Sequence, residues 1–93
     1  ESSVRYLAHE LGPKAIRVNA ISAGAIRTRA SSGIEHFDEL IDETIRKAPL
    51  RRTVTPDEVG RAALLLASDY TTGTTGEVLH VDAGFNVAGM VFH

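Results

Sequence analysis

The chain has 93 residues, of which 43% are hydrophobic, no cysteine and a net charge of −2. This length allows one small domain or a piece of a larger one, and the hydrophobic fraction excludes an intrinsically disordered chain. Charges of both signs are mixed along the sequence, which argues against nucleic-acid binding, and no apolar run is long enough for a membrane helix. The absence of cysteine excludes disulfides and thiolate metal sites and fits a cytoplasmic protein.

The first predicted element is a helix that ends at Gly12-Pro13. Its apolar residues fall at helical spacing on one face: Val4, Leu7, Ala8 and Leu11. Glycine followed by proline is a strong helix stop. Because the chain opens in or near this helix and has no initial methionine, we expect it to be the C-terminal part of a longer protein.

A strand is predicted over residues 16–22, followed by a loop over residues 23–34. The strand is nearly continuous in apolar residues, which is typical of a strand buried on both faces. Within residues 17–28, RVNAISAGAIRT, side chains become small around Gly24 and a hydroxyl returns at Thr28. Ligands of open α/β sheets bind outside the carboxyl ends of the strands. We therefore expect a ligand site to begin near Ala23, with a plain strand-to-helix loop as the alternative.

Two helices follow this loop. The first is predicted over residues 37–47 and is ended by Pro49; its apolar residues would by default belong to the core: Phe37, Leu40, Ile41 and Ile45. The second begins at the capping-box sequence Thr55-Pro56-Asp57-Glu58 and runs to about residue 68. Leu64 and Leu65 widen its apolar surface, so we expect this helix to be well buried.

The last predicted element is a short strand over residues 78–81, after a turn-rich connector over residues 71–76. Residues 82–93 show little pattern. Two buried strands joined by a helical crossover predict a parallel α/β fold. Two strands do not form a stable sheet, so the other strands must come from residues outside this chain or from a partner.

The remaining candidate sites favour structural interpretations. No metal-ligand spacing is formed by the histidines, His9, His36, His80 and His93. His80 lies in the apolar second strand, where a core or interface role is expected rather than that of a base. Residues 73–76, GTTG, lead into a strand and predict a turn, not a phosphate loop, and Arg51-Arg52 is expected to be solvated. Neither a G-x-S-x-G nor a G-x-G-x-x-G motif is present.

Three segments carry a family resemblance: RVNAISAGAIRT, KAPLRRTVTPDEVG and LLLASDYTTGTTGEVLHVDAGF. Together they resemble the C-terminal third of a short-chain dehydrogenase/reductase, and SAGAIRT with APLRRT resembles the bacterial enoyl-acyl-carrier-protein reductases of fatty-acid synthesis. The resemblance implies the C-terminal portion of a Rossmann-type, doubly wound parallel sheet. Residues 1–93 would then form the nicotinamide side of a single reductase domain, with a substrate-binding loop over residues 28–48, the last strand and the tail.

The same resemblance implies an activity and partners. Such enzymes reduce the trans-2 double bond of an acyl chain on acyl carrier protein with NADH, or NADPH in some members, and are usually homotetramers. Their tyrosine and lysine would fall before Glu1, and Tyr6 matches a position past the lysine, so no catalytic residue is expected in this chain and the isolated chain should be inactive. The rivals are a 3-oxoacyl-acyl-carrier-protein reductase, disfavoured by Ala23-Gly24 where proline-glycine is usual, and a non-catalytic relative kept for assembly.

The resemblance also assigns site residues. The backbone of Ile26 would meet the nicotinamide carboxamide and the hydroxyl of Thr28 the cofactor, with Arg27, Arg29 and Ala30 continuing that wall. The acyl chain would face Ile34, Phe37 and Leu40, under a lid. Two departures from the family pattern are Ala25, where proline is usual, and Ala83, where Asp-Gly-Gly is usual. Ala83 must therefore adopt a conformation open to a residue with a Cβ.

Overall fold

The computed structural model describes residues 2–26 and 36–91. In chain order the elements are α1 (Ser2–Leu11), β1 (Ala20–Ala23), α2 (Phe37–Lys47), α3 (Pro56–Ala67), β2 (Val78–Val81) and α4 (Phe85–Val91), with short 3-10 helices at Gly12–Lys14 and Asp69–Thr71. The opening helix, the helix over residues 37–47, the capped helix and the strand over residues 78–81 are confirmed.

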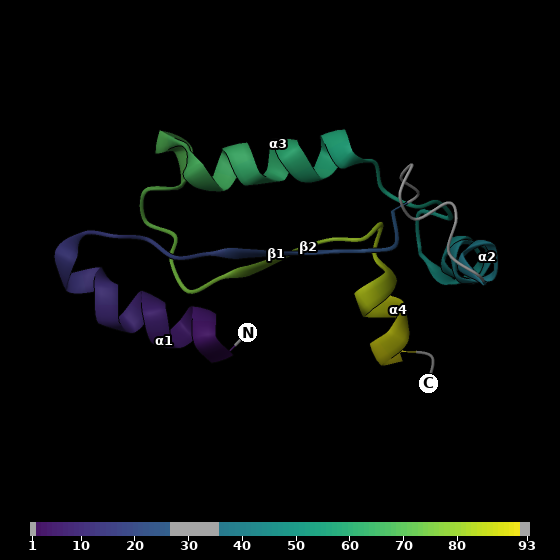
Figure 1. The fold of residues 1–93 in the computed structure, drawn as a ribbon, viewed down its shortest axis with the longest axis horizontal. Helices are drawn as coiled ribbons and strands as arrows, with labels where there is room; N and C mark the ends of the chain where they lie inside the picture. Colours follow the sequence, from purple (N-terminus) through teal and green to yellow (C-terminus); the bar gives the residue numbers. More distant parts are fainter. Residues whose placement is uncertain (1, 27–35, 92–93) are drawn as a thin grey trace.

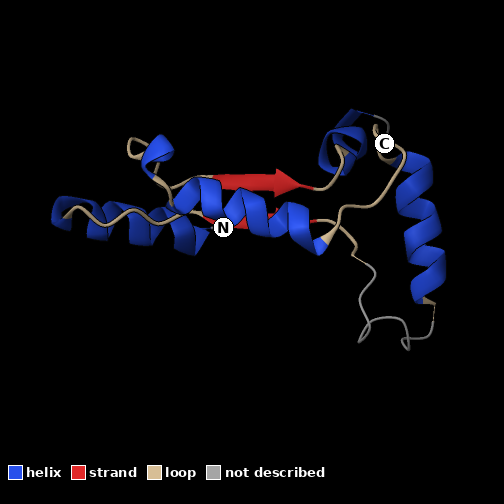
Figure 2. Ribbon diagram, turned by 90° about the horizontal axis from the view of Figure 1, so that it is seen from above, coloured by secondary structure: helices blue, strands red, loops and turns tan. Residues whose placement is uncertain are grey.

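The two described strands form a parallel pair, as predicted. Ala20 lies opposite Val78 and Ala23 opposite Val81. Helix α3 lies along one face of the pair, and α1 lies on the opposite side, mostly beyond the amino ends of the strands (Figure 1). Seen from above, α2 lies beyond the carboxyl ends of the strands and runs across their direction (Figure 2). The layers are those of an α/β fold, and α2 is placed where ligands of such sheets bind.

Helix α3 begins with the predicted capping box. The Thr55 hydroxyl accepts the Glu58 N–H at 3.2 Å, and a Glu58 carboxylate oxygen accepts the Thr55 N–H at 2.9 Å. Arg52 donates to both Glu58 oxygens, each at 2.8 Å. The hydrogen bonds from Arg52, with that from the Thr55 backbone, lower the pKa of Glu58 to about 2. We expected Arg51-Arg52 to be solvated. Arg52 is indeed exposed, but its side chain is also bound to Glu58 at the start of α3.

The first strand is shorter than the predicted range of residues 16–22. Side chains replace part of the strand ladder before Ala20: the Val18 N–H donates to the Thr75 hydroxyl at 3.0 Å, although the Val18 carbonyl still accepts the Gly76 N–H at 2.8 Å. The Asn19 amide donates to the Thr74 carbonyl at 3.1 Å and accepts the Glu77 N–H at 3.0 Å. Apolar character alone did not reveal this exchange, since it depends on partners more than fifty residues along the chain.

Three further expectations were wrong for this chain. Helix α3 is not well buried: Leu64 is 71% and Leu65 47% exposed, because the strand pair covers only one side of the helix. The core role expected for His80 is wrong, since this residue is exposed on β2, whereas the interface role stays a prediction. The patternless tail contains α4, whose start is fixed by Asp82: its carboxylate accepts the N–H groups of Gly84 and Asn86, each at 3.0 Å. An aspartate before a glycine was the available signal for that helix start.

Candidate functional site

An apolar cluster forms at the carboxyl ends of the two strands, where the sequence predicted a ligand site. Its buried members are Ala48, Val54 and Ala83, and partly buried residues pack against it, namely Ile26, Val59, Val81 and Phe85. These residues come from the segment after β1, the connection from α2 to α3, the turn after β2, and the adjoining elements α3, β2 and α4. The cluster therefore joins the predicted cofactor wall, through Ile26, to the end of the predicted substrate helix, through Ala48.

Gly24 shows why the side chains shrink after β1. Its N–H donates to the Val81 carbonyl at 3.0 Å. A Cβ at this position would lie 3.0 Å from the Cβ and 3.1 Å from the Cα of Asp82. The group that comes close to Gly24 is thus Asp82, directly after β2, and the glycine lets the two strand ends stay together.

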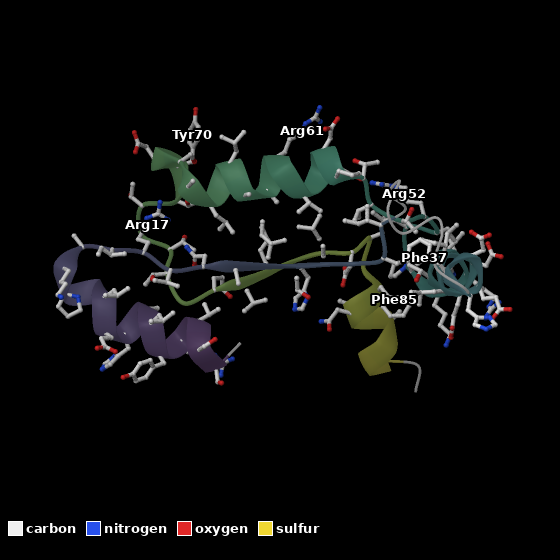
Figure 3. All side chains as sticks on the ribbon, viewed as in Figure 1. Arg17, Phe37, Arg52, Arg61, Tyr70 and Phe85 are labelled. Atoms are coloured by element: carbon white, nitrogen blue, oxygen red, sulfur yellow. The ribbon has the colours of Figure 1, made fainter. Side chains whose placement is uncertain are left out.

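The structure places three of the eight predicted site residues. Ile26 is half-buried against the cluster, Phe37 is half-buried at the first position of α2, and Leu40 on the same helix is 49% exposed. Phe37 and Phe85 lie at the α2–α4 end of the molecule (Figure 3). The other five predicted site residues lie outside the described residues: Arg27, Thr28, Arg29, Ala30 and Ile34.

The turn after β2 contains contacts that the sequence interpretation missed. The Ala83 carbonyl accepts the N–H of Leu50 at 3.1 Å, which ties β2 to the connection after α2. Ala83 has a φ of 58° and Gly84 a φ of 91°. Ala83 thus keeps the left-handed conformation that glycine adopts freely, at a cost of about 1–2 kcal/mol for a residue with a Cβ. The sequence signal for this turn was Ala83, which stands where the family usually has the first glycine of Asp-Gly-Gly. That signal did not reveal which residues the turn contacts.

A hollow of about 390 Å³ lies beside this turn, with Arg52, Glu58, His80 and Asp82 among its lining residues. Three of its polar groups already have partners within the chain: Arg52 pairs with Glu58, and Asp82 accepts backbone N–H groups. Within the described part of the chain, no group of three acidic or histidine residues is placed to hold a metal ion. The same residues contain no helix long and apolar enough to cross a membrane.

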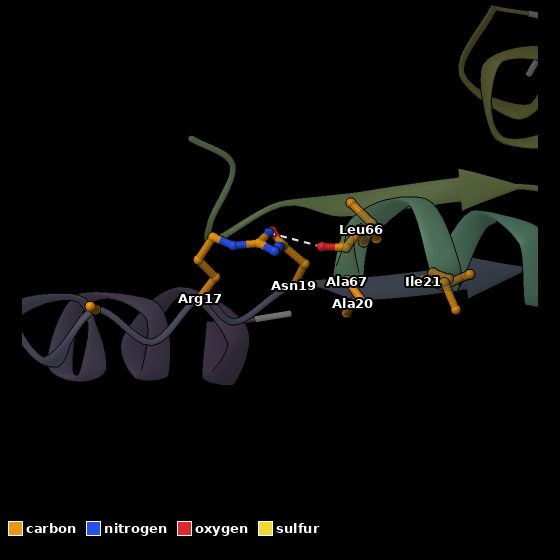
Figure 4. Close-up of a pocket in the computed structure, with 8 residues that line it drawn as sticks. Arg17, Asn19, Ala20, Ile21, Leu66 and Ala67 are labelled. Carbon is orange, nitrogen blue, oxygen red and sulfur yellow. Dashed lines mark hydrogen bonds between the residues drawn. The ribbon is translucent and has the colours of Figure 1, made fainter. Parts of the chain in front are cut away.

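A second hollow, of about 350 Å³, lies between β1 and α3 at the opposite end of the strands (Figure 4). Arg17 contributes its polar side, and the guanidinium donates to the carbonyls of Leu66 at 2.8 Å and Thr74 at 3.2 Å. Because that cation is already bound by carbonyls at the end of α3, the hollow has a structural explanation and we assign no ligand to it.

Comparison with known proteins identifies the family to which this chain belongs. The family model described as enoyl-(acyl carrier protein) reductase matches residues 1–86. The chain belongs to this enoyl reductase family. This match confirms the resemblance to the enoyl-acyl-carrier-protein reductases that the sequence motifs indicated. The likeness to solved enoyl reductases confirms the Rossmann-type α/β fold class.

The similar proteins are bacterial enoyl-acyl-carrier-protein reductases. The chain is 59% identical over 90 residues to the NADH-dependent enzyme of Nostoc, covering 97% of this chain and 35% of that protein. It is 51% identical to the NADH-dependent enzyme of Escherichia coli, covering 97% of this chain and 34% of that protein. The chain spans about a third of the length of the curated relatives it matches.

Solved enoyl reductases share the fold. The Bacillus cereus enzyme, determined with NADP⁺ and indole naphthyridinone, gives a TM-score of 0.85 at 51% identity, covering 92% of this chain and 34% of that one. The Anaplasma phagocytophilum enzyme, determined with NAD, gives 0.81 at 49% identity, covering 92% of this chain and 30% of that one. The family's members thus include dinucleotide-bound structures that match this chain over nearly its whole length.

Proposed function

We propose that this chain forms the nicotinamide side and the substrate lid of an enoyl-acyl-carrier-protein reductase, which reduces the trans-2 double bond of an acyl thioester. The observation that carries the proposal is the cluster at the carboxyl ends of the strands. It joins Ile26, the first residue of the predicted cofactor wall, to Ala48 at the end of α2. A reductase needs cofactor and acyl chain side by side, and one rigid cluster supports both walls.

The proposed roles follow the two sides of this cluster. On the cofactor side, the Ile26 backbone and the Thr28 hydroxyl hold the nicotinamide end, and Arg27, Arg29 and Ala30 continue the wall. On the substrate side, residues 28–48 form the binding loop and helix, with Ile34, Phe37 and Leu40 facing the acyl chain. The partial exposure of Phe37 and Leu40 at the open end of the sheet supports this assignment. We assign no catalytic acid or base to this chain and expect it to be inactive alone.

The bound dinucleotide supplies a hydride for the β-carbon, and this chain orients the acceptor. We propose NADH, since the matched relatives of Nostoc and E. coli are named as NADH enzymes. NADPH is the alternative, because the B. cereus structure contains NADP⁺. Comparing KM for the two cofactors distinguishes them.

The proposed macromolecular partners are acyl carrier protein, which delivers the substrate, and further copies of the reductase in a homotetramer. The exposed apolar side of α3 supports an assembly surface. Leu64 is 71% and Tyr70, just beyond the helix, 92% exposed. Tyr70 and Arg61 point away from the sheet (Figure 3).

The direct test uses a graft in which residues 1–93 replace the matching third of the Nostoc reductase. We expect this graft to oxidise NADH when given crotonyl thioester, at a rate close to that of the unaltered Nostoc enzyme. A folded graft that acts on a 3-oxoacyl thioester and leaves the enoyl thioester untouched would assign the chain to the rival reductases. A folded graft without either activity would favour the non-catalytic alternative.

Thr28→Ala in the graft is expected to raise KM for NADH by about twofold to tenfold, the value of one lost hydrogen bond. KM for the enoyl thioester should change less, because the hydroxyl is assigned to the cofactor. Steady-state kinetics with each substrate varied in turn measures both constants. Thr28→Ser keeps the hydroxyl and is the matched control; an unchanged KM for NADH in Thr28→Ala would remove Thr28 from the cofactor wall.

The Arg52–Glu58 pair is expected to make the graft's stability depend on acidity. The pKa of Glu58 is lowered from 4.5 to about 2 in the folded chain, so its contribution is fully present above pH 4.5 and is lost as the pH falls toward 2. Glu58→Gln should therefore reduce the fall of the thermal midpoint between pH 6 and roughly pH 3. Glu10→Gln, an exposed change on α1, is the control. Parallel curves for the graft and Glu58→Gln would contradict the assigned pKa.

A further inference from the structure

Gly84 is constrained twice by its surroundings. Its φ of 91° lies in the region that favours glycine. A Cβ at Gly84 would also lie 2.8 Å from Cγ, 2.9 Å from Cδ and 3.1 Å from Cβ of Pro49. A proline ring is held to its own backbone and cannot swing aside, so a larger residue would have to displace the chain at Pro49.

Pro49 follows the end of α2 directly, so this contact acts on the proposed substrate helix. Ala48, the C-terminal cap residue of α2, is 0% exposed, and its N–H donates to the Thr44 carbonyl at 2.8 Å. The next N–H, that of Leu50, donates to the Ala83 carbonyl at 3.1 Å. The end of α2 is therefore fixed by burial, by a backbone hydrogen bond and by the contact of the proline ring with Gly84.

The turn after β2 is itself held from its other side. The Asp82 carboxylate accepts the N–H groups of Gly84 and Asn86, and the Asp82 carbonyl accepts the N–H of Phe85 at 3.1 Å. Phe85 packs against the same cluster as Ala48 and Ile26, and α4, which begins at Phe85, contacts α2. A displacement of this turn would thus reach α2 through both the Pro49 contact and α4.

We propose that the turn at Ala83 and Gly84 is a positioning element for the acyl-binding helix α2, with Gly84 as the residue that sets where the helix ends. The proposal rests on the assignment of α2 to the substrate side. It makes the turn after the last strand, which is not assigned to touch the acyl chain, a determinant of substrate binding. The turn acts through Pro49, so Gly84 is a positioning residue and not a catalytic one.

The test is Gly84→Ala in the graft. We expect KM for the enoyl thioester to rise by about fivefold, while KM for NADH changes by less than about twofold. Hydrogen exchange of the α2 amides without substrate should become faster than in the unsubstituted graft, because the end of the helix is no longer seated. The exchange measurement needs no activity, so it tests the turn even if the proposed function fails in the unsubstituted graft.

Two further variants separate the contact from general strain. Gly76→Ala is the matched control: φ at Gly76 is 74°, but its Cβ would meet only the Ala8 Cβ, at an ordinary 3.5 Å. It should lower stability without altering the enoyl KM or α2 exchange. Pro49→Ala removes the two ring atoms closest to the new Cβ and should restore both readouts in the Gly84→Ala background, including its folding if Gly84→Ala alone does not fold. Equal behaviour of the two glycine variants, or no rescue by Pro49→Ala, would overturn the proposal.

Discussion

Replacing Arg17 with methionine is expected to lower the thermal unfolding midpoint of the graft by roughly 6–12 °C, corresponding to about 3 kcal/mol at 2–4 °C per kcal/mol for a protein of this size. The guanidinium donates to the Leu66 carbonyl at 2.8 Å, the Thr74 carbonyl at 3.2 Å and the Ser68 carbonyl at 3.4 Å. The final carbonyls of a helix have no partner within the helix. Methionine keeps much of the side-chain volume but removes the charged donor, so that the Leu66 carbonyl keeps only the Thr71 hydroxyl and the Thr74 carbonyl only the Asn19 amide.

Differential scanning calorimetry of the graft measures this shift. Arg61→Met is the matched control, because it removes an arginine from the exposed side of α3, where the side chain points away from the sheet (Figure 3). Arg17→Lys keeps the charge but has a single donor group and should give an intermediate midpoint. Equal midpoints for Arg17→Met and Arg61→Met would show that the carbonyls at the end of α3 do not need the guanidinium.

The elements that sequence predicted well are those specified within a few residues. The box of Thr55 and Glu58, with Pro56 between them, contains all the groups that start α3, and its geometry matches the prediction. The Gly12-Pro13 stop is equally local. The apolar spacing and the following Pro49 together predicted the observed bounds of α2.

The features that sequence did not reveal depend on partners distant along the chain. The early end of the strand ladder depends on Thr74 and Thr75 reaching Val18 and Asn19. The exposure of Leu64 was missed because an apolar side chain predicts burial without saying which surface covers it. The end of the strand ladder and the exposure of Leu64 both depend on how elements distant in the sequence pack together, which a local sequence pattern does not show.

For the candidate site, too, the sequence predicted the local features and missed the contacts between distant segments. The motif ending at Thr28 predicts a ligand site at the carboxyl ends of the strands, which stays a prediction, and the family resemblance supplied the residue roles. Neither indicated that Gly84 contacts Pro49, because this pairing joins two turns on different elements. Gly24 shows the same limit: the sequence predicted a ligand near this residue, but the group that approaches it is Asp82, in the turn after β2.

The expected result for Gly24→Val follows from that approach. A Cβ at position 24 would lie 3.0 Å from the Asp82 Cβ and 3.1 Å from its Cα, so the ends of β1 and β2 must separate. Overpacking of this kind costs about 1–3 kcal/mol of stability. The branched side chain of valine adds atoms next to the Asp82 backbone, which cannot move aside easily, so we expect a cost near the upper end of this range. The thermal midpoint of the graft should fall by roughly 6–12 °C.

This change should also reach the cofactor. Ile26 lies two residues beyond Gly24 and packs on the cluster that contains Ala83, so moving the strand ends apart shifts the proposed nicotinamide wall. We expect KM for NADH to rise in Gly24→Val, measured beside Gly73→Val, where a Cβ meets no atom within 4 Å. A loss of stability with an unchanged KM for NADH would separate the strand contact from the cofactor wall. A midpoint as high as that of Gly73→Val would show that the Asp82 backbone yields to a side chain at position 24.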